Sequence, residues 1–171
     1  MDRALLDALG RDLQGELGVQ WWVGDALPLR DEWRETESGL YRSIHLIHAL
    51  MERAQGGEGN ARRTWRLAIA DAGLCAEGVG EVFGEAAMEG CCAVVGIQPL
   101  RGGSGADGQV LRARLLTQAV HELGHLAGAG HCRRASCVMY PSRHIADSDH
   151  KGHTFCAECR DALKLRGVQK T

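Results

Sequence analysis

The spacing of apolar residues along the chain predicts four helices. Leucines recur every three or four residues within residues 2–17, which predicts a first helix there. A second amphipathic pattern begins at Leu40 and predicts a helix that ends near Gln55. The longest pattern predicts a helix from about residue 109 to 127, and the last pattern predicts a short helix close to the C-terminal end of the chain.

Apolar runs between these helices predict the strands of a sheet. Residues 19–23 predict the first strand, residues 65–71 a central strand, and residues 91–98 a buried strand that Pro99 closes. Residues 81–86 are shorter, contain glycine and carry two carboxylates, which are features of an edge strand protected from further pairing. Strands that alternate with helices predict an α/β sandwich with a twisted, largely parallel sheet.

Length and composition are those of one compact domain with at most a small appendage. The chain has 171 residues, of which 44% are hydrophobic, and its net charge of −2 gives no indication of a nucleic-acid partner. The sequence has no apolar run of the length that a signal peptide or a membrane span needs, so we expect a cytoplasmic monomer without membrane partners. In a reducing cytoplasm, its seven cysteines would serve as thiols or metal ligands.

One stretch of the chain has the spacing of a zinc site with its own base. His121 and His125 lie four residues apart, so both imidazoles project from one face of the predicted helix. Gly128 can adopt the positive φ that ends a helix, and His131 can then approach the same ion. Three protein ligands leave one position of a tetrahedral Zn²⁺ open for water, whose pKa zinc lowers to about 7, and Glu122 is placed to take its proton.

The helix that carries these histidines also has a polar side. His121 and His125 share that side with Arg114, Thr117 and Gln118, so we expect it to face away from the core, toward a cleft. A glycine, Gly124, lies inside the same helix at a cost of about 1 kcal/mol relative to alanine. We therefore expect a local need for space at this position.

Four cysteines near the C-terminal end form two short clamps, Cys132-x4-Cys137 and Cys156-x2-Cys159. The residues that follow the histidine motif are too few to bury a core of their own, so a covalent or metal staple is expected. Four thiolates fit a closed structural zinc site, whose binding would contribute directly to folding. The alternative is a pair of disulfides, which a reducing compartment disfavours.

Together, these residues carry a resemblance to a known family. The run HExxHxxGxxHC-x4-C-x-M, followed by C-x2-C, resembles the archaemetzincins, which are zinc peptidases of the metzincin clan. The resemblance implies a catalytic Zn²⁺ held by His121, His125 and His131, and a second, structural Zn²⁺ held by the four cysteines. It also implies that Met139 forms the Met-turn, a hydrophobic floor beneath the catalytic histidines.

The same resemblance implies a metallopeptidase with a peptide or protein substrate. In metzincins, an antiparallel edge strand lies along the cleft and pairs with the extended substrate through main-chain hydrogen bonds. The corresponding residues here are Val82, Phe83, Gly84 and Glu85. We accordingly divide the chain into an α/β subdomain over residues 1–130 and a small zinc-stapled subdomain over residues 131–171.

Two other interpretations remain open. The four-cysteine unit could bind nucleic acid or protein, but residues 131–171 with zinc bound have a charge of only about +2, which is weak for phosphate binding. Such a module would also leave the HExxHxxGxxH spacing unexplained. The chain could instead be a zinc-binding protein with little general proteolytic activity.

Some further motifs have a simpler explanation. The GxGxxG match at residues 103–108 lacks the strand that a dinucleotide site needs after it, so we expect a loop in which Ser104 or Asp107 caps the next helix. The role of Tyr140, one residue after Met139, is left open. The histidines outside the motif are expected to be ordinary polar-face or solvent-facing residues. They are His45, His48, His144, His150 and His153.

Overall fold

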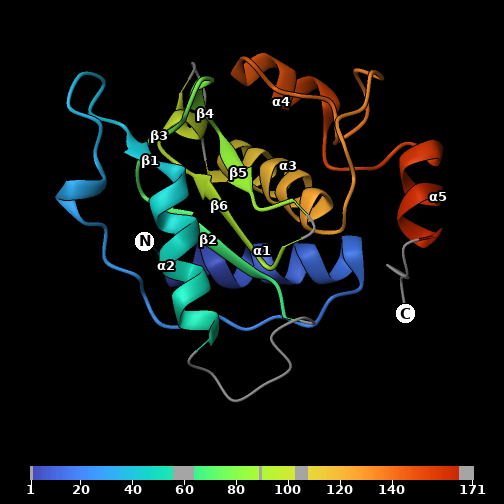
Figure 1. Cartoon of the computed structure of the whole chain (residues 1–171). Helices are drawn as coiled ribbons and strands as arrows, with labels where there is room; N and C mark the ends of the chain where they lie inside the picture. The colour runs from blue at the N-terminus through green and yellow to red at the C-terminus, as the bar shows by residue number, and fades with distance from the viewer. Residues whose placement is uncertain (1, 56–63, 89, 103–107, 166–171) are drawn as a thin grey trace.

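The computed structural model describes residues 2–55, 64–88, 90–102 and 108–165 (Figure 1). Its helices are α1 (Arg3–Leu17), α2 (Ser43–Gln55), α3 (Gly108–Leu126), α4 (Ile145–Lys151) and α5 (Ala157–Leu165), with 3₁₀ turns η1 (Asp31–Trp33) and η2 (Pro99–Arg101). Its strands are β1 (Tyr41–Arg42), β2 (Arg66–Ala70), β3 (Leu74–Ala76), β4 (Gly80–Val82), β5 (Gly84–Ala86) and β6 (Cys92–Gly96). The predicted capping residues Ser104 and Asp107 lie outside the described residues.

The four predicted helices are confirmed as α1, α2, α3 and α5. The fifth, α4, has the sequence IADSDHK, in which a single large apolar residue gives no amphipathic pattern to detect. In α1, the Asp2 side chain accepts a hydrogen bond from the Ala4 backbone amide, and Gly18 ends the helix with a φ of 69°. The helix ends at Leu17, as the leucine pattern over residues 2–17 predicts.

The strand predicted at residues 19–23 is wrong. This segment has no regular secondary structure and pairs with no strand, and Trp22 is 70% exposed. Trp21 instead lies on α1, where a Cβ added at Gly10 would fall 2.1 Å from its ring, and its Nε1 donates to Gln14. The apolar character of this segment therefore reflects the packing of Trp21 on a helix and not pairing in a sheet.

The described strands form two small mixed sheets. One has the order β2-β6-β5, with β2 parallel and β5 antiparallel to β6; the other has the order β1-β3-β4, with a parallel β1-β3 pair and an antiparallel β3-β4 pair. The buried strand predicted at residues 91–98 is confirmed as β6, in which every residue is buried. The run at residues 65–71 was predicted to be central, but β2 lies at the edge of its sheet, and β6 takes the central place.

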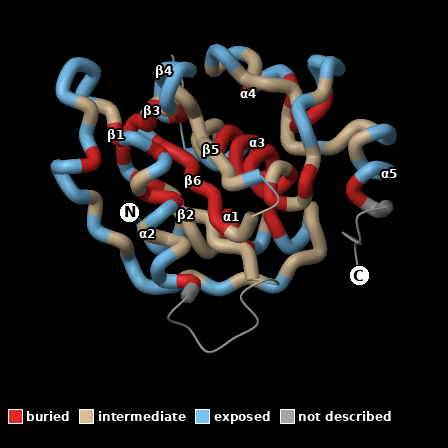
Figure 2. The backbone as a smooth tube through the Cα atoms, viewed as in Figure 1, coloured by how far each residue is buried: buried red, intermediate tan, exposed pale blue. Residues whose placement is uncertain are grey.

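Helices cover both faces of β6 (Figure 1). Ala93 and Val95 pack into one apolar cluster with α1 and α3, whereas Cys92 and Val94 pack into a second cluster with α2. Figure 2 shows the buried residues concentrated in β6 and α3. The predicted α/β fold is thus confirmed, and its central strand brings α3 against the sheet.

The predicted edge strand at residues 81–86 is divided at Phe83. β4 pairs with β3 in one sheet, and β5 pairs with β6 in the other. β5 is antiparallel and lies at the sheet edge beside α3, which it contacts.

The predicted subdomain boundary after residue 130 stays a prediction. No helix among the described residues has the length and apolar character to cross a membrane.

Candidate metal centres and the cleft beside them

Three histidine rings converge at the C-terminal end of α3. His121 and His125 project from successive turns of the helix, and their Nε2 atoms lie 3.2 Å apart. Gly128, with a φ of 86°, follows the helix, and the chain returns so that His131 joins them. One ligand atom from each ring lies within 4.8 Å of the others. Ligand atoms about 2.0–2.1 Å from a tetrahedral Zn²⁺ are roughly 3.4 Å apart, so the three imidazoles fit such an ion.

Backbone carbonyls fix the orientation of two of these rings. The Nδ1 atom of His121 lies 2.7 Å from the Val138 oxygen, and the Nδ1 atom of His125 lies 2.8 Å from the Ala129 oxygen. Because a carbonyl oxygen only accepts, each Nδ1 carries the proton and each Nε2 presents a lone pair. This is the arrangement that metal-binding histidines usually have.

The electrostatic environment keeps these rings neutral, as metal ligation requires. Burial lowers the pKa of His121 well below its ordinary value, and the charges of Lys151 and His125 lower it further. Burial also lowers the pKa of His125 and of His131. Neutral imidazole is the form that binds a metal ion.

Glu122 is buried beside the histidines and beside the sheet edge. It is 3% exposed, and a Cβ added at Gly84 of β5 would lie 2.7 Å from its Oε1 atom. Burial raises the pKa of Glu122 to about 8, while the Lys151 ammonium lowers it and Glu85 raises it. Glu85 itself accepts a hydrogen bond from the Ser43 hydroxyl. The carboxyl group of Glu122 can therefore exchange a proton near neutral pH.

Lys151 is a buried residue of this centre that no sequence pattern indicates. It is 3% exposed, and its Nζ atom donates to the Tyr140 carbonyl oxygen at 2.8 Å and lies 3.3 Å from His121 Nδ1. Burial lowers the pKa of Lys151 to about 8, and Glu122 acts in the opposite direction. A lysine at the end of a polar seven-residue helix carries no sequence signal of burial.

The four cysteines of the two clamps come together in a second cluster. Their sulfur atoms lie within 4.8 Å of one another, and the Cys132 and Cys156 sulfurs are 3.9 Å apart. A disulfide would need about 2.05 Å, whereas sulfurs about 2.3 Å from a tetrahedral zinc are roughly 3.8 Å apart. All four are free thiols, and the Cys159 backbone amide lowers the pKa of Cys156 to about 7. The sulfurs therefore fit a zinc ion and not two disulfides.

Met139 lies fully buried beneath α3. A Cβ added at Gly124 would fall 2.5 Å from its sulfur and 3.2 Å from a ring carbon of Phe155. Gly124 stands between His121 and His125, so the methionine packs under the turn that joins the two histidines. The close approach of Met139 explains why position 124 is a glycine, as the sequence indicated.

The polar side of α3 is largely covered, and only its N-terminal part lines a pocket, of about 390 Å³, to which Arg114 and Thr117 contribute but the ligand histidines do not. Arg114, Thr117, Gln118 and His121 are all buried, because α4 packs over this side of the helix. The remaining histidines belong to neither ligand cluster among the described residues. His48, His144 and His150 are exposed, and His45 and His153 are half-buried.

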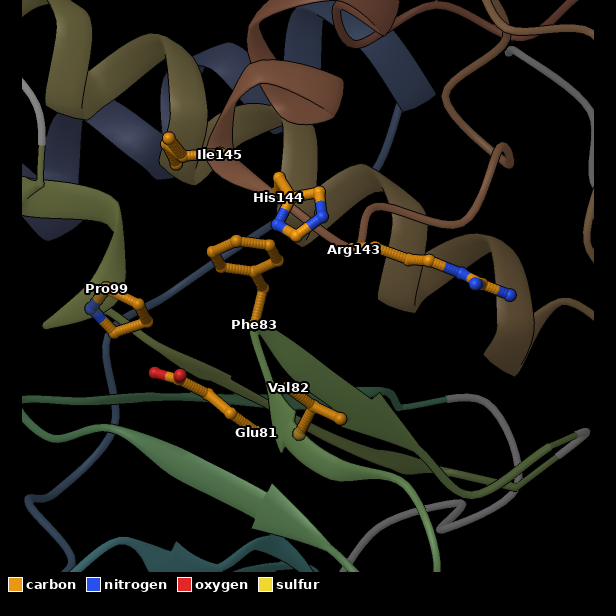
Figure 3. Close-up of a pocket in the computed structure, with 7 residues that line it drawn as sticks. All are labelled: Glu81, Val82, Phe83, Pro99, Arg143, His144 and Ile145. Carbon is orange, nitrogen blue, oxygen red and sulfur yellow. The ribbon is translucent and has the colours of Figure 1, made fainter. Parts of the chain in front are cut away.

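A pocket opens beside the N-terminal end of β5 (Figure 3). It has a volume of about 220 Å³, and its lining comprises Glu81, Val82, Phe83, Pro99, Arg143, His144 and Ile145. Phe83 points toward the α4 end of the pocket, and Arg143 points away from it (Figure 3). Its apolar residues are half-buried, and Glu81, Arg143 and His144 are exposed, so the pocket offers both apolar contacts and polar groups.

The backbone of β5 presents hydrogen-bonding groups along the same edge. Phe83 and Ala87 bond to β6 through their main chains, and Glu85 is opposite Val94 in the same register. In an antiparallel ladder, alternate residues direct their N–H and C=O groups to opposite sides. Those of Gly84 and Ala86 therefore point away from β6.

Comparisons with known proteins identify the family of this chain. The family model described as "Peptidase family M54" matches residues 62–165. The chain is 39% identical over 100 residues to archaemetzincin of Archaeoglobus fulgidus, which covers 58% of this chain and 59% of that protein. It is 34% identical over 123 residues to archaemetzincin of Methanopyrus kandleri, with 72% and 67% covered.

Solved structures are similar over most of the chain. The crystal structure of archaemetzincin from A. fulgidus complexed with malonate matches with a TM-score of 0.79 and 26% identity, over 94% of this chain and 93% of that one. Archaemetzincin from M. kandleri matches with a TM-score of 0.81 and 26% identity, over 97% and 87%. The sequence alignments are shorter, and those to the relatives from A. fulgidus and Methanocaldococcus jannaschii each span 59% of the relative's length.

Proposed function

This chain belongs to peptidase family M54, and from that premise we propose that it is a zinc-dependent metallopeptidase that hydrolyses peptide bonds. In this proposal, His121, His125 and His131 hold a catalytic Zn²⁺, and the four clamp cysteines hold a structural one. The observation that carries the proposal is the convergence of three imidazoles, with one ligand atom from each within 4.8 Å of the others, next to the buried carboxyl group of Glu122.

The chain's own residues supply the remaining parts of the reaction. Bound Zn²⁺ polarises a peptide carbonyl and lowers the pKa of water. Glu122 takes a proton from the attacking water and later delivers one to the leaving nitrogen; its burial raises its pKa and so favours the uptake of the proton. The outward N–H and C=O groups of Gly84 and Ala86 hold an extended peptide by adding it as a strand to the edge of the sheet.

The proposal is tested by replacing the base while keeping its shape. We expect Glu122→Gln to retain two zinc ions per chain and to cleave a mixed peptide library roughly 10²- to 10⁴-fold more slowly than the wild type. Zinc is measured by elemental analysis and cleavage by mass spectrometry. Glu52→Gln removes an exposed carboxyl group on α2 and should cleave like the wild type. Equal cleavage by the Glu122→Gln variant and the wild type would remove Glu122 from its proposed role.

A further inference from the structure

The pocket beside β5 is built from three separate parts of the chain. One wall is the end of β4 with Phe83, the second is Pro99 of η2, and the third comprises residues 143–145 at the start of α4 (Figure 3). The first wall is joined to Gly84, which lies against Glu122. A peptide held along β5 with its scissile bond at Glu122 would therefore place a neighbouring side chain in this pocket.

Arg114 of α3 holds the other two walls. Its Nη1 atom donates to the carbonyl oxygens of Leu100 at 3.0 Å and Gly102 at 2.6 Å, which fixes η2. Its Nε and Nη2 atoms donate to the two carboxylate oxygens of Asp149 at 2.7 Å each, which fixes α4. The residue is only 8% exposed. Charge-assisted, paired bonds of this kind are strong and directional.

Two further contacts prevent α4 from turning about this ion pair. The Gln118 side chain of α3 donates to the Ser148 hydroxyl at 3.1 Å. At the other end of α4, Lys151 donates to the Tyr140 carbonyl. Because α3 also carries Glu122, eight residues or about 12 Å along the helix from Arg114, the pocket walls are tied to the same rigid element as the base.

We propose that Arg114 is a positioning residue that determines side-chain specificity, because it holds η2 and α4 at the separation that forms the pocket next to Glu122. The proposal rests on the proposed peptidase function of the site. Under this proposal, the peptidase prefers substrates with a large apolar side chain beside the scissile bond, because such a side chain fits between Phe83, Pro99 and Ile145. The proposal also separates this preference from the chemical step, since Arg114 lies two helical turns from the base.

The test compares Arg114→Lys with a matched substitution on the same helix. Lysine keeps the charge but cannot reproduce the paired bonds. The control is Arg112→Lys, which breaks a similar pair, to Asp12 at 2.6 Å, that connects α3 to α1 rather than to the pocket. Asp149→Asn is the second test variant and alters the more exposed partner, so it serves if Arg114→Lys does not fold. The probes are labelled alanine hexapeptides that carry Gly, Leu or Phe at one central position.

We expect the test variants to lose the preference for large apolar side chains and to keep the rate of the chemical step. In Arg114→Lys and Asp149→Asn, the preference for Leu or Phe over Gly should fall roughly tenfold through KM, while kcat for the glycine peptide and both zinc contents stay unchanged. Arg112→Lys should keep the wild-type preference. An unchanged preference in both test variants would overturn the proposal, as would a uniform loss of kcat or the same loss of preference in Arg112→Lys.

Binding separates this proposal from the peptidase function. The same peptides are titrated against Glu122→Gln alone and combined with Arg114→Lys, with fluorescence anisotropy as the readout. If the wild type cleaves none of the peptides, the peptidase function is unsupported, yet preferential binding of Leu and Phe that the second substitution abolishes would still support Arg114. Binding without preference in Glu122→Gln alone would overturn the role of Arg114.

Discussion

At the scale of single residues, two glycines set the geometry of the candidate centre. Gly84 lets β5 approach the Glu122 carboxyl group, and Gly124 lets Met139 pack beneath the two helix histidines. The sequence indicated the close packing at Gly124, because glycine destabilises the interior of a helix and its presence there suggests that a side chain would not fit. The sequence did not indicate the close approach at Gly84, because glycine in a short edge strand is common and its neighbour lies 38 residues away in the chain.

Gly84→Ala tests the close approach of β5 to the proposed base. An added Cβ would lie 2.7 Å from Glu122 Oε1 and 2.8 Å from the Val94 carbonyl oxygen, so the carboxyl group or the strand must move. We expect kcat/KM for peptides to fall roughly 10²-fold, because displacements of about 1 Å have effects of that size. Zinc content should not change. Gly24→Ala, which adds a Cβ with no atom within 4 Å, is the control, and wild-type kinetics in Gly84→Ala would contradict this placement.

At the scale of elements, α3 was the part of the fold that the sequence predicted best. Its length and its histidine spacing are local properties, and the HExxHxxGxxH run fixes the return of the chain to His131. What covers its polar side was not predictable, because Asp149 and Lys151 come from a short polar helix more than 20 residues later. The strand predicted at residues 19–23 was wrong for a related reason, since a short apolar run does not distinguish a strand from a segment that packs on a helix.

Gly124→Ala tests the packing between α3 and Met139. Alanine should favour the helix by about 1 kcal/mol, but crowding a filled core costs about 1–3 kcal/mol. With Met139 fully buried, we expect the crowding to prevail and the free energy of unfolding to fall by roughly 1 kcal/mol, as measured by urea denaturation. Gly15→Ala in α1, where a Cβ meets no atom within 4 Å, should not destabilise the protein. A Gly124→Ala protein as stable as the wild type would show that Met139 can move aside.

At the scale of the whole molecule, the two ligand clusters are connected through residues 137–139. Cys137 belongs to the cysteine cluster, the Val138 carbonyl orients His121, and Met139 supports α3. The Met139 carbonyl also accepts a hydrogen bond from the Cys132 amide at 2.9 Å. A structural zinc would therefore stabilise the floor of the catalytic centre as well as the C-terminal segment.

Cys156→Ala tests this connection. We expect loss of the structural zinc, a clear drop in the melting temperature and weaker zinc binding at the histidines, as measured by competition with a chelator. Cys91→Ala removes a half-buried thiol outside the cluster and should retain both zinc ions. Unchanged metal content and melting temperature in Cys156→Ala would argue against a structural zinc site.

The most direct measurement is anomalous X-ray scattering at the zinc edge from crystals of the zinc-loaded protein. We expect one peak about 2.0–2.1 Å from a ring nitrogen of each of His121, His125 and His131, beside the Glu122 carboxyl group. We expect a second peak about 2.3 Å from the four clamp sulfurs. A zinc-loaded crystal without a peak that all three histidines reach would contradict the assignment of this centre.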